Sequence, residues 1–240
     1  METAVAVKGL VRNYGTLRAV DNLSFNINPG EVFGLIGPNG SGKTTTLRIV
    51  ATLLKPTAGS VSVFGLDVVK QASAVRKVIS YLPEEAGAYR NLSGLNYLRF
   101  MATFYTKDTV ECERLVAKGS ELADLGRRIE DKVSTYSKGM ARKLLLARAL
   151  MTEPKLTILD EPTSGLDVEN ATEIRQRIKE FAHKGTTVLL SSHNMLEVEF
   201  LSDRVAIIRE GRVIAVGTPA ELKSRYNSAN LEEVFLKAER

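Results

Sequence analysis

The stretch Gly37-Pro38-Asn39-Gly40-Ser41-Gly42-Lys43-Thr44-Thr45 matches the pattern G-x-x-x-x-G-K-[ST], which is typical of a phosphate-binding loop. It follows the apolar run Val32–Ile36, which predicts a buried strand, and it leads into residues 43–54, which have helical spacing. The glycines let the backbone bend until N–H groups point inward at phosphate oxygens. The helix presents its positive N-terminal end to the same anion. The stretch therefore predicts a phosphate site between a strand and a helix.

Two side chains of this loop have separate expected roles. Lys43 places a compact positive charge between the β- and γ-phosphates of a bound triphosphate. Thr44 offers its hydroxyl to Mg²⁺, whose octahedral shell is completed by waters and phosphates. We expect the whole loop to bind the nucleotide, through Gly37, Pro38, Asn39, Gly40, Ser41, Gly42, Lys43, Thr44 and Thr45.

A second apolar strand ends in two acids, in Leu156-Thr157-Ile158-Leu159-Asp160-Glu161. Ligands of open parallel sheets bind at the carboxyl ends of the strands, so both acids are expected at the same cleft as the loop. Asp160 is expected to hold the metal through a water, and Glu161 to take a proton from an attacking water or polarise it. A strand that ends in Asp-Glu is weak evidence for a functional site by itself. Beside a phosphate loop, the same ending becomes strong evidence.

Length and composition limit the class of protein. A chain of 240 residues is long for one small domain and short for two full ones, which favours one domain with an insertion. The hydrophobic share of 44% and the charged share of 25% argue against disorder. Cys112 is the only cysteine, so no intrachain disulfide is possible and a reducing cytosolic setting fits.

Charge and hydropathy exclude some partners. No charge-free apolar run approaches the ~20 residues that span a bilayer, and we expect no signal peptide. The net charge of +5 is compatible with anionic ligands or an anionic membrane surface. It is too small to argue for nucleic acid, so no nucleic-acid partner is expected.

Strands alternate with helices along the chain, which favours an α/β sheet. Residues 187–190 predict another buried strand. Helices are expected over residues 168–183 and 194–201, and a hairpin over 205–216. Thr218 predicts the capped start of a further helix, with Pro219 at its first position and Glu221 closing a capping box.

Residues 91–131 interrupt the alternation with apolar side chains at helical spacing, which predicts an inserted helical subdomain. We expect its aromatic side chains to be core rather than ligand contacts: Tyr97, Phe100, Phe104 and Tyr105. The tail predicts a short amphipathic helix whose apolar side chains are Leu231, Val234, Phe235 and Leu236. Packing back on the domain is favoured over binding a partner.

Three further motifs narrow the choice among proteins with a phosphate loop. Ser137-Lys138-Gly139-Met140 precedes a helix-forming run, Ser164-Gly165-Leu166-Asp167 follows the acidic pair, and Ser191-Ser192-His193 follows the next strand. With these motifs in order, residues 14–217 resemble an ATP-binding cassette ATPase, the nucleotide-binding subunit of an ABC transporter. The guanine-specificity motif Asn-Lys-x-Asp of most GTPases does not occur.

The resemblance implies an α/β P-loop NTPase fold with a mixed sheet core, an N-terminal antiparallel β-subdomain and an inserted α-helical subdomain. We expect the nucleotide-binding domain over residues 1–225, with the helical subdomain inserted at about 88–150. Residues 226–240 are then a C-terminal helical tail.

The resemblance also implies a site shared between two subunits. Ser137 and Gly139 would donate from a helix N-terminus to the γ-phosphate held by a second subunit. Asp167 would cross the interface and link the two sites, and His193 would act as the switch histidine that orients the water. Lys138 departs from the usual Leu-Ser-Gly-Gly-Gln and either adds positive charge near the phosphates or points to solvent.

Two more residues match family positions. Tyr14 stands where an aromatic ring stacks on adenine; the alternative is a half-buried loop tyrosine. Glu84 stands where glutamine is usual and could coordinate Mg²⁺ or a water, as a metal-dependent sensor that joins the sheet to the helical insertion.

The resemblance implies that the chain hydrolyses ATP with Mg²⁺, with Glu161 as the base, His193 positioning the water and Lys43 balancing charge. ATP would close a homo- or heterodimer and hydrolysis would reopen it. The dimer would dock, through the groove near residues 84–92, on a separate transmembrane permease at the cytoplasmic face of the membrane. Residues 82–94 look most like ATPases of exporters for drugs, antibiotics or ions.

Two other functions fit a phosphate loop. A soluble cassette ATPase of translation or DNA repair usually carries two cassettes or a long coiled coil, and neither fits 240 residues. A nucleotide-binding regulator that does not hydrolyse is the other alternative, and the presence of Glu161 and His193 argues against it.

Overall fold

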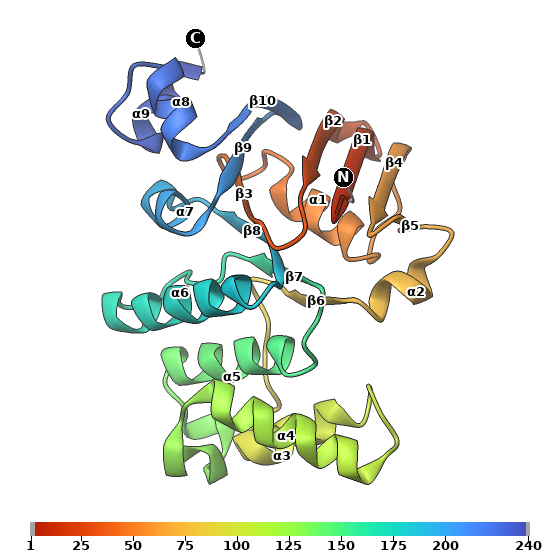
Figure 1. Ribbon diagram of the computed structural model, residues 1–240, viewed down its shortest axis with the longest axis vertical. Coiled ribbons are helices and arrows are strands. Elements are labelled where there is room, and N and C mark those ends of the chain that lie inside the picture. Colours follow the sequence, from red (N-terminus) through yellow and green to blue (C-terminus); the bar gives the residue numbers. More distant parts are fainter. Residues whose placement is uncertain (1–2, 239–240) are drawn as a thin grey trace.

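The computed structural model describes residues 3–238 (Figure 1). Its larger sheet has six strands in the order β10-β9-β3-β8-β7-β6. Their bounds are Arg212–Gly217 (β10), Arg204–Arg209 (β9), Val32–Ile36 (β3), Thr187–Ser192 (β8), Leu156–Asp160 (β7) and Ile79–Leu82 (β6). β3 is parallel to both β8 and β9, whereas β10 is antiparallel to β9. The sheet is therefore mixed, as predicted.

The smaller sheet has four antiparallel strands in the order β2-β1-β4-β5. Their bounds are Leu17–Ile27 (β2), Val5–Tyr14 (β1), Ala58–Val63 (β4) and Leu66–Asp67 (β5). This sheet is the expected N-terminal antiparallel unit. Tyr14 at the end of β1 and Ala19 on β2 lie beside the phosphate loop that follows β3.

Nine α-helices connect and cover the strands within residues 3–238. Their bounds are Lys43–Val50 (α1), Ala72–Arg76 (α2), Gly94–Ala102 (α3), Thr109–Ala123 (α4), Lys138–Leu150 (α5), Val168–His183 (α6), Met195–Leu201 (α7), Pro219–Arg225 (α8) and Leu231–Ala238 (α9). Short 3-10 helices lie at Gly126–Glu130 and Val133–Thr135. Figure 1 shows α3 and α4 at one end of the molecule, beyond α5 and away from β1 and β2. We propose that α3, α4 and α5 form the subdomain inserted at about residues 88–150.

Strand β3 is buried on both faces, which explains its continuous apolar run. Val32 and Ile36 belong to the core shared with α5, α6 and α7, whereas Phe33 and Leu35 belong to the core shared with β1, β2 and α1. Gly34 allows the close approach of α7, because a Cβ there would lie 2.6 Å from Val198 Cγ1. The end of β3, where the phosphate loop begins, is therefore fixed from two sides.

Helix α1 is shorter than predicted. It ends at Val50 rather than near residue 54. The chain then turns back, because the N–H groups of Leu53 and Leu54 both donate to the Arg48 carbonyl, at 2.8 and 3.2 Å. Thr52 takes the left-handed φ of 64° that this turn requires. Helical spacing alone did not predict this local reversal.

The prediction that four aromatic residues of the insertion are core is wrong for three of them. Tyr97 is buried, but Phe100, Phe104 and Tyr105 are exposed. The reason is that α3 ends at Ala102, so the last two follow the helix instead of lying on its inner face. The exposed Phe100 ring makes T-shaped, edge-to-face contacts, with its centroid 5.2 Å from that of Phe104 and 5.4 Å from that of Tyr89.

The C-terminal elements follow the predicted chemistry. Glu210 and Gly211 make the tight turn of the β9–β10 hairpin, both with positive φ. Thr218 and Glu221 form the expected capping box at the start of α8. In α9, Leu231 is buried against α7 and α8, as predicted, but the prediction that Leu236 shares this apolar side is wrong, because Leu236 is exposed.

Within residues 3–238, no helix combines the length and apolar character needed to cross a bilayer.

Candidate nucleotide site

The phosphate loop connects β3 to α1 with the geometry that the motif requires. Gly37 is needed for a close approach, because a Cβ there would lie 2.1 Å from the carbonyl oxygen of Ile208. Gly42 is needed for its φ of 102° and because a Cβ would lie 2.6 Å from the Ala19 carbonyl oxygen. The loop thus bends between strand β9 and strand β2, with α1 starting immediately behind it.

The β9–β10 turn also supports this loop. The N–H of Gly211 donates to the Ser41 carbonyl at 3.0 Å, and the Gly211 carbonyl accepts from the Asp21 N–H at 2.9 Å. The turn therefore joins the phosphate loop to β2 by backbone hydrogen bonds. These partners are far apart in the sequence.

Lys43 lies inside the loop rather than in solvent. Its Nζ donates to the carbonyls of Gly37 at 2.7 Å and Pro38 at 3.1 Å. Burial lowers the pKa of Lys43, and the negative charges of Glu161, Asp160 and Glu84 oppose that shift. The ammonium is thus held by carbonyls of the loop and lies near these three carboxylates.

A cavity of about 270 Å³ opens in front of the loop. Its lining brings together residues from β1, β2, the loop, α1 and the ends of β6 and β7: Tyr14, Leu17, Ala19, Asn39, Gly40, Gly42, Lys43, Thr44, Thr45, Glu84 and Glu161. The predicted loop, Tyr14, Glu84 and Glu161 therefore meet at one place.

Tyr14 stands at the outer end of this cavity, at the last position of β1. Its ring is 42% exposed, and the Arg12 guanidinium carbon lies 4.7 Å from the ring centroid. The ring is thus partly covered by a cation and otherwise open, so it offers a flat apolar surface for a base to stack on.

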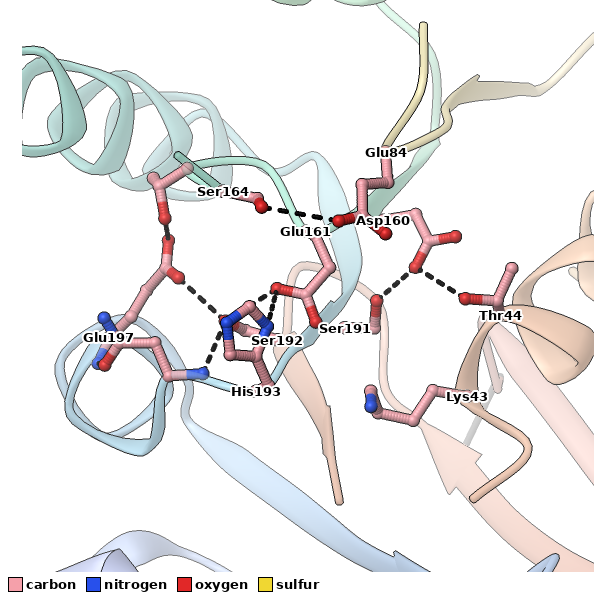
Figure 2. Close-up of polar contacts among 12 residues, drawn as sticks. Lys43, Thr44, Glu84, Asp160, Glu161, Ser164, Ser191, Ser192, His193 and Glu197 are labelled. Atoms are coloured by element: carbon pink, nitrogen blue, oxygen red, sulfur yellow. Dashed lines mark hydrogen bonds and ion pairs between the residues drawn. The ribbon is translucent and has the colours of Figure 1, made fainter. Parts of the chain in front are cut away.

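Asp160 and Thr44 bring two side-chain oxygens together beside the cavity (Figure 2). Thr44 Oγ1 donates to Asp160 Oδ1 at 3.2 Å, and Ser191 Oγ donates to the same oxygen at 2.5 Å. Across residues 3–238 there is no group of three or more His, Cys, Asp or Glu side chains that would hold a metal by itself. One hydroxyl and one carboxylate fit Mg²⁺, which keeps waters and phosphate oxygens as its other ligands.

Glu84 approaches this site from the loop after β6. Its Oε1 accepts from Ser164 Oγ at 3.3 Å. Figure 2 shows its side chain close to Asp160, on the side away from Thr44. In this conformation Glu84 lines the cavity and bonds to the 164–167 segment instead of to Thr44.

Glu161 follows β7 directly in a left-handed conformation with φ of 48°. Its Oε2 accepts from His193 Nδ1 at 2.8 Å and from Ser192 Oγ at 3.3 Å. Burial raises the pKa of Glu161, the hydrogen bond and charge of His193 and the charge of Lys43 lower it, and Glu84 raises it further. The net direction is upward, which suits a carboxylate that takes a proton near neutral pH.

The predicted shared residues lie apart from this cavity, at the N-termini of two helices. Ser137 caps α5, accepting at its Oγ from the Met140 N–H at 3.2 Å. Asp167 caps α6, accepting at Oδ1 from the Asn170 N–H at 2.9 Å. Gly139 packs on Asn170, because a Cβ there would lie 2.3 Å from the Asn170 Cγ. The structure brings Ser137, Gly139 and Asp167 together, but does not place them at the Lys43 cavity.

Lys138 is exposed, which agrees with the alternative that it points to solvent, and its side chain reaches over the loop after β7. A Cβ on Gly165 would lie 1.9 Å from Lys138 Nζ, so the ammonium rests on the loop between Glu161 and Asp167. Gly165 has a φ of 65° and no side chain, which leaves room for this contact. The side chain thus lies between the start of α5 and the loop that leads into α6.

Sequence analysis missed a buried hydroxyl–carboxylate network behind Glu161. Glu197 is 1% exposed and accepts from Thr163 Oγ1 at 2.6 Å and from Ser192 Oγ at 2.9 Å. Ser192 also reaches Glu161, so the network supports the acid from the side of α7. A charged residue on the buried face of a predicted helix was the available signal. Arg142 on α5 was missed in the same way.

The central sheet, the phosphate loop and the acids at the end of β7 define an α/β P-loop NTPase fold. The sequence model of the ABC transporter family matches residues 20–164. The chain therefore belongs to this family of ATP-binding cassette proteins. The predicted family and fold class are therefore confirmed.

Relatives at the sequence level are named for resistance and export. The chain is 38% identical over 241 residues to the daunorubicin resistance ATP-binding protein DrrA3 of Streptomyces coeruleorubidus, covering 99% of this chain and 75% of that protein. It is 35% identical to the linearmycin resistance ATP-binding protein LnrL of Bacillus subtilis, covering 96% and 77%. It is 36% identical to the Nod factor export ATP-binding protein I of Paraburkholderia xenovorans, covering 98% and 77%. These names do not support the alternative of translation or DNA repair.

Solved structures share the whole fold. One described as the ATP binding subunit of an ABC transporter superposes with a TM-score of 0.88 at 30% identity, covering 99% of this chain and 100% of that one. A dimeric, post-hydrolysis ATP-binding cassette bound to ADP and Pi gives a TM-score of 0.80 at 25% identity, covering 89% and 98%.

Proposed function

We propose that this chain binds and hydrolyses ATP as the ATP-binding subunit of an ABC exporter. The observation that carries the proposal is the single cavity in which Lys43, Thr44 and Glu161 meet, with Asp160 bonded to Thr44. Membership of the ABC transporter family supports ATP as the nucleotide. The names of the relatives support export.

The proposed binding mode assigns each end of ATP to one side of the cavity. Tyr14 stacks on adenine, and residues 37–45 take the phosphates through backbone N–H groups and the N-terminus of α1. When ATP binds, Lys43 Nζ gives up part of its hydrogen bonding to the Gly37 and Pro38 carbonyls and neutralises charge on the β- and γ-phosphates. Its position between the loop and the acids supports this role.

Thr44 and Asp160 are the residues that would hold Mg²⁺, and Glu84 is the third candidate from the same cavity. The donor set of hydroxyl and carboxylate oxygens supports this ion. When bound, Mg²⁺ neutralises charge that develops on the β- and γ-phosphate oxygens.

The proposed reaction is in-line attack of water on the γ-phosphate. A bond forms between the water oxygen and phosphorus, the bond to the β–γ bridging oxygen breaks, and ADP leaves with that electron pair. Glu161 takes the proton from the water, which the raised pKa of its carboxyl favours. His193, through Nδ1–H, keeps the carboxylate turned toward the cavity. Lys43 stabilises the charge on the departing oxygens.

The proposed active unit contains two copies or a pair of related chains. Ser137, Gly139 and Asp167 sit at helix N-termini outside the Lys43 cavity. Ser137 and Gly139 are then available to a neighbour's γ-phosphate, and Asp167 crosses the interface and links the two sites. The solved neighbour that forms a dimer supports this arrangement. ATP closes the dimer and loss of the γ-phosphate opens it.

The proposed partner is a separate transmembrane permease, and docking on it places the chain at the cytoplasmic face of the membrane. We test the function with phosphate release from ATP by the purified chain, with Mg²⁺ and with EDTA. Membrane fractions are then probed for co-sedimentation of the chain. Turnover with Mg²⁺ and recovery with membranes are expected. Recovery with ribosomes or DNA instead would assign the chain to the alternative function.

A further inference from the structure

Arg142 is a buried cation in the middle of the molecule. It lies on α5, the helix that Ser137 caps, and is 7% exposed. No carboxylate within residues 3–238 forms an ion pair with it. Its guanidinium instead donates to backbone carbonyls only: Nε to Pro162 at 2.7 Å, Nη1 to Pro83 at 3.3 Å and Glu84 at 3.1 Å, and Nη2 to Asp160 at 3.1 Å and Glu161 at 2.7 Å.

These carbonyls belong to two segments that are distant in sequence. One is the loop after β6, which carries Glu84, and the other is the turn after β7, which carries Glu161. Arginine has five N–H donors in a rigid planar fork, and here every donor has a carbonyl acceptor. The fork therefore fixes the separation of the two segments as well as their attachment to α5.

The contact to Glu161 fixes an unfavourable backbone conformation. A φ of 48° is uncommon for glutamate, and it sets the direction in which the side chain leaves the turn. The Glu161 N–H donates to the Ser191 carbonyl at 3.0 Å, while its own carbonyl accepts from Arg142 at 2.7 Å. Both backbone polar groups of the candidate base are thus held, one by β8 and one by α5.

The carboxylates around Arg142 partly offset the effect of burial on its guanidinium. Burial lowers the pKa of Arg142, and the nearby charges of Glu84, Asp160, Glu197 and Glu161 raise it. Arginine stays protonated in proteins, so it supplies one positive charge among these carboxylates. A neutral side chain at position 142 would remove this positive charge from the carbonyls and carboxylates around it.

We propose that Arg142 is a positioning residue that couples the seating of α5 to the geometry of Glu161 and Glu84. This inference rests on the proposed function. A movement of the first turn of α5, where Ser137 would meet the neighbour's nucleotide, is passed by the rigid helix and the guanidinium to both segments at once. Hydrolysis of ATP is then fast only when α5 is in the position that holds Glu161 and Glu84 in their working geometry.

The first test compares Arg142→Lys with Arg148→Lys in the purified full chain. Lysine keeps the charge but cannot serve carbonyls of both segments, so kcat is expected to fall by about 100-fold, as misplacement of a reacting group by an ångström does. The KM for ATP is expected to change by no more than about threefold, because the phosphate loop is untouched. Arg148 is the control: it lies on the same helix and has one long bond, of 3.5 Å, to the Tyr81 carbonyl. Equal losses in the two variants, or a kcat for Arg142→Lys within about twofold of wild type, would overturn the proposal.

The second test measures backbone hydrogen exchange and does not need turnover. In Arg142→Lys, peptides covering residues 83–86 and 160–164 are expected to exchange faster than in wild type, while peptides from β3 stay unchanged. Acceleration across the whole chain would assign Arg142 a merely structural role, and unchanged exchange in either segment would refute the coupling. If the wild-type chain hydrolyses no ATP, the proposed function fails, and this measurement still decides whether Arg142 holds the two segments together.

Discussion

The phosphate loop and the N-termini of α5 and α6 differ in what one chain provides. Around the loop, Lys43, Thr44 and Glu161 converge on a cavity of about 270 Å³. At the helix N-termini, Ser137 and Asp167 have their capping bonds satisfied within the chain and line no part of that cavity. The first region thus gathers the groups that would bind a nucleotide, whereas the second region supplies none of the residues that line the cavity around Lys43. This difference is what the proposed site shared between two chains would require.

The largest expected effect separates chemistry from binding in the first region. Glu161→Gln removes the proton acceptor and keeps the size of the side chain, so kcat is expected to fall by about 100- to 10,000-fold. ATP binding is retained, and an ATP-bound dimer accumulates, which size-exclusion chromatography with ATP and Mg²⁺ detects. A variant that stays monomeric at saturating ATP and Mg²⁺ would contradict the shared site.

Lys43→Met tests whether the first region needs its buried cation. Because the ammonium is the one side-chain charge inside the loop, we expect turnover to fall by about 100- to 1,000-fold. ATP affinity, measured by calorimetry, is expected to fall as well, unlike in Glu161→Gln. Unchanged affinity would mean that the loop amides alone hold the phosphates.

Ser137→Ala tests the second region. It removes an N-cap, which costs about 1 kcal/mol of stability, and the donor offered to the neighbour's nucleotide. Ser93→Ala is the matched control, because Ser93 caps α3 through the same bond to the Asn96 N–H, at 3.2 Å.

Both serine variants are expected to lose similar thermal stability, but only Ser137→Ala should lower kcat, by about tenfold. Affinity of the isolated chain for ATP should not change in either variant. If Ser93→Ala lowers kcat as much as Ser137→Ala does, the effect is one of stability, and the second region has no special part in turnover.

The smallest expected effect is a shift of the pH–rate profile. The pKa of Glu161 is raised by burial and, in part, by the charge of Glu84. Turnover therefore falls as the pH drops through this raised pKa, because the base becomes protonated. Glu84→Gln removes one negative neighbour, which lowers the pKa of Glu161 and moves the acid limb of kcat to lower pH. An unmoved acid limb would mean that another group sets it.

Sequence patterns predicted the parts of this protein whose chemistry is local. The phosphate loop, the strand that ends at Asp160 and the capping box at Thr218 each depend on neighbours in the chain. The pattern of Phe100, Phe104 and Tyr105 misled because hydrophobicity does not say where α3 ends.

The rest of the site depends on partners that sequence spacing does not reveal. Arg142 is satisfied by carbonyls from residues 83–84 and 160–162, and Glu197 by hydroxyls from Thr163 and Ser192. Carbonyl acceptors exist at every residue, so no pattern marks the ones that a buried arginine will use. The contact of Lys138 with the loop at Gly165 also depends on a partner that is distant in the sequence.

The bond between Gly211 and Ser41 has a consequence for protein fragments. The matched segment, residues 20–164, contains the whole loop and both acids, yet the backbone that supports the loop belongs to the β9–β10 turn. Deleting that hairpin would leave the Ser41 carbonyl without its donor and remove Ile208 from against Gly37. A piece of the chain that retains the loop and both acids but lacks the β9–β10 hairpin is therefore expected to bind nucleotide poorly.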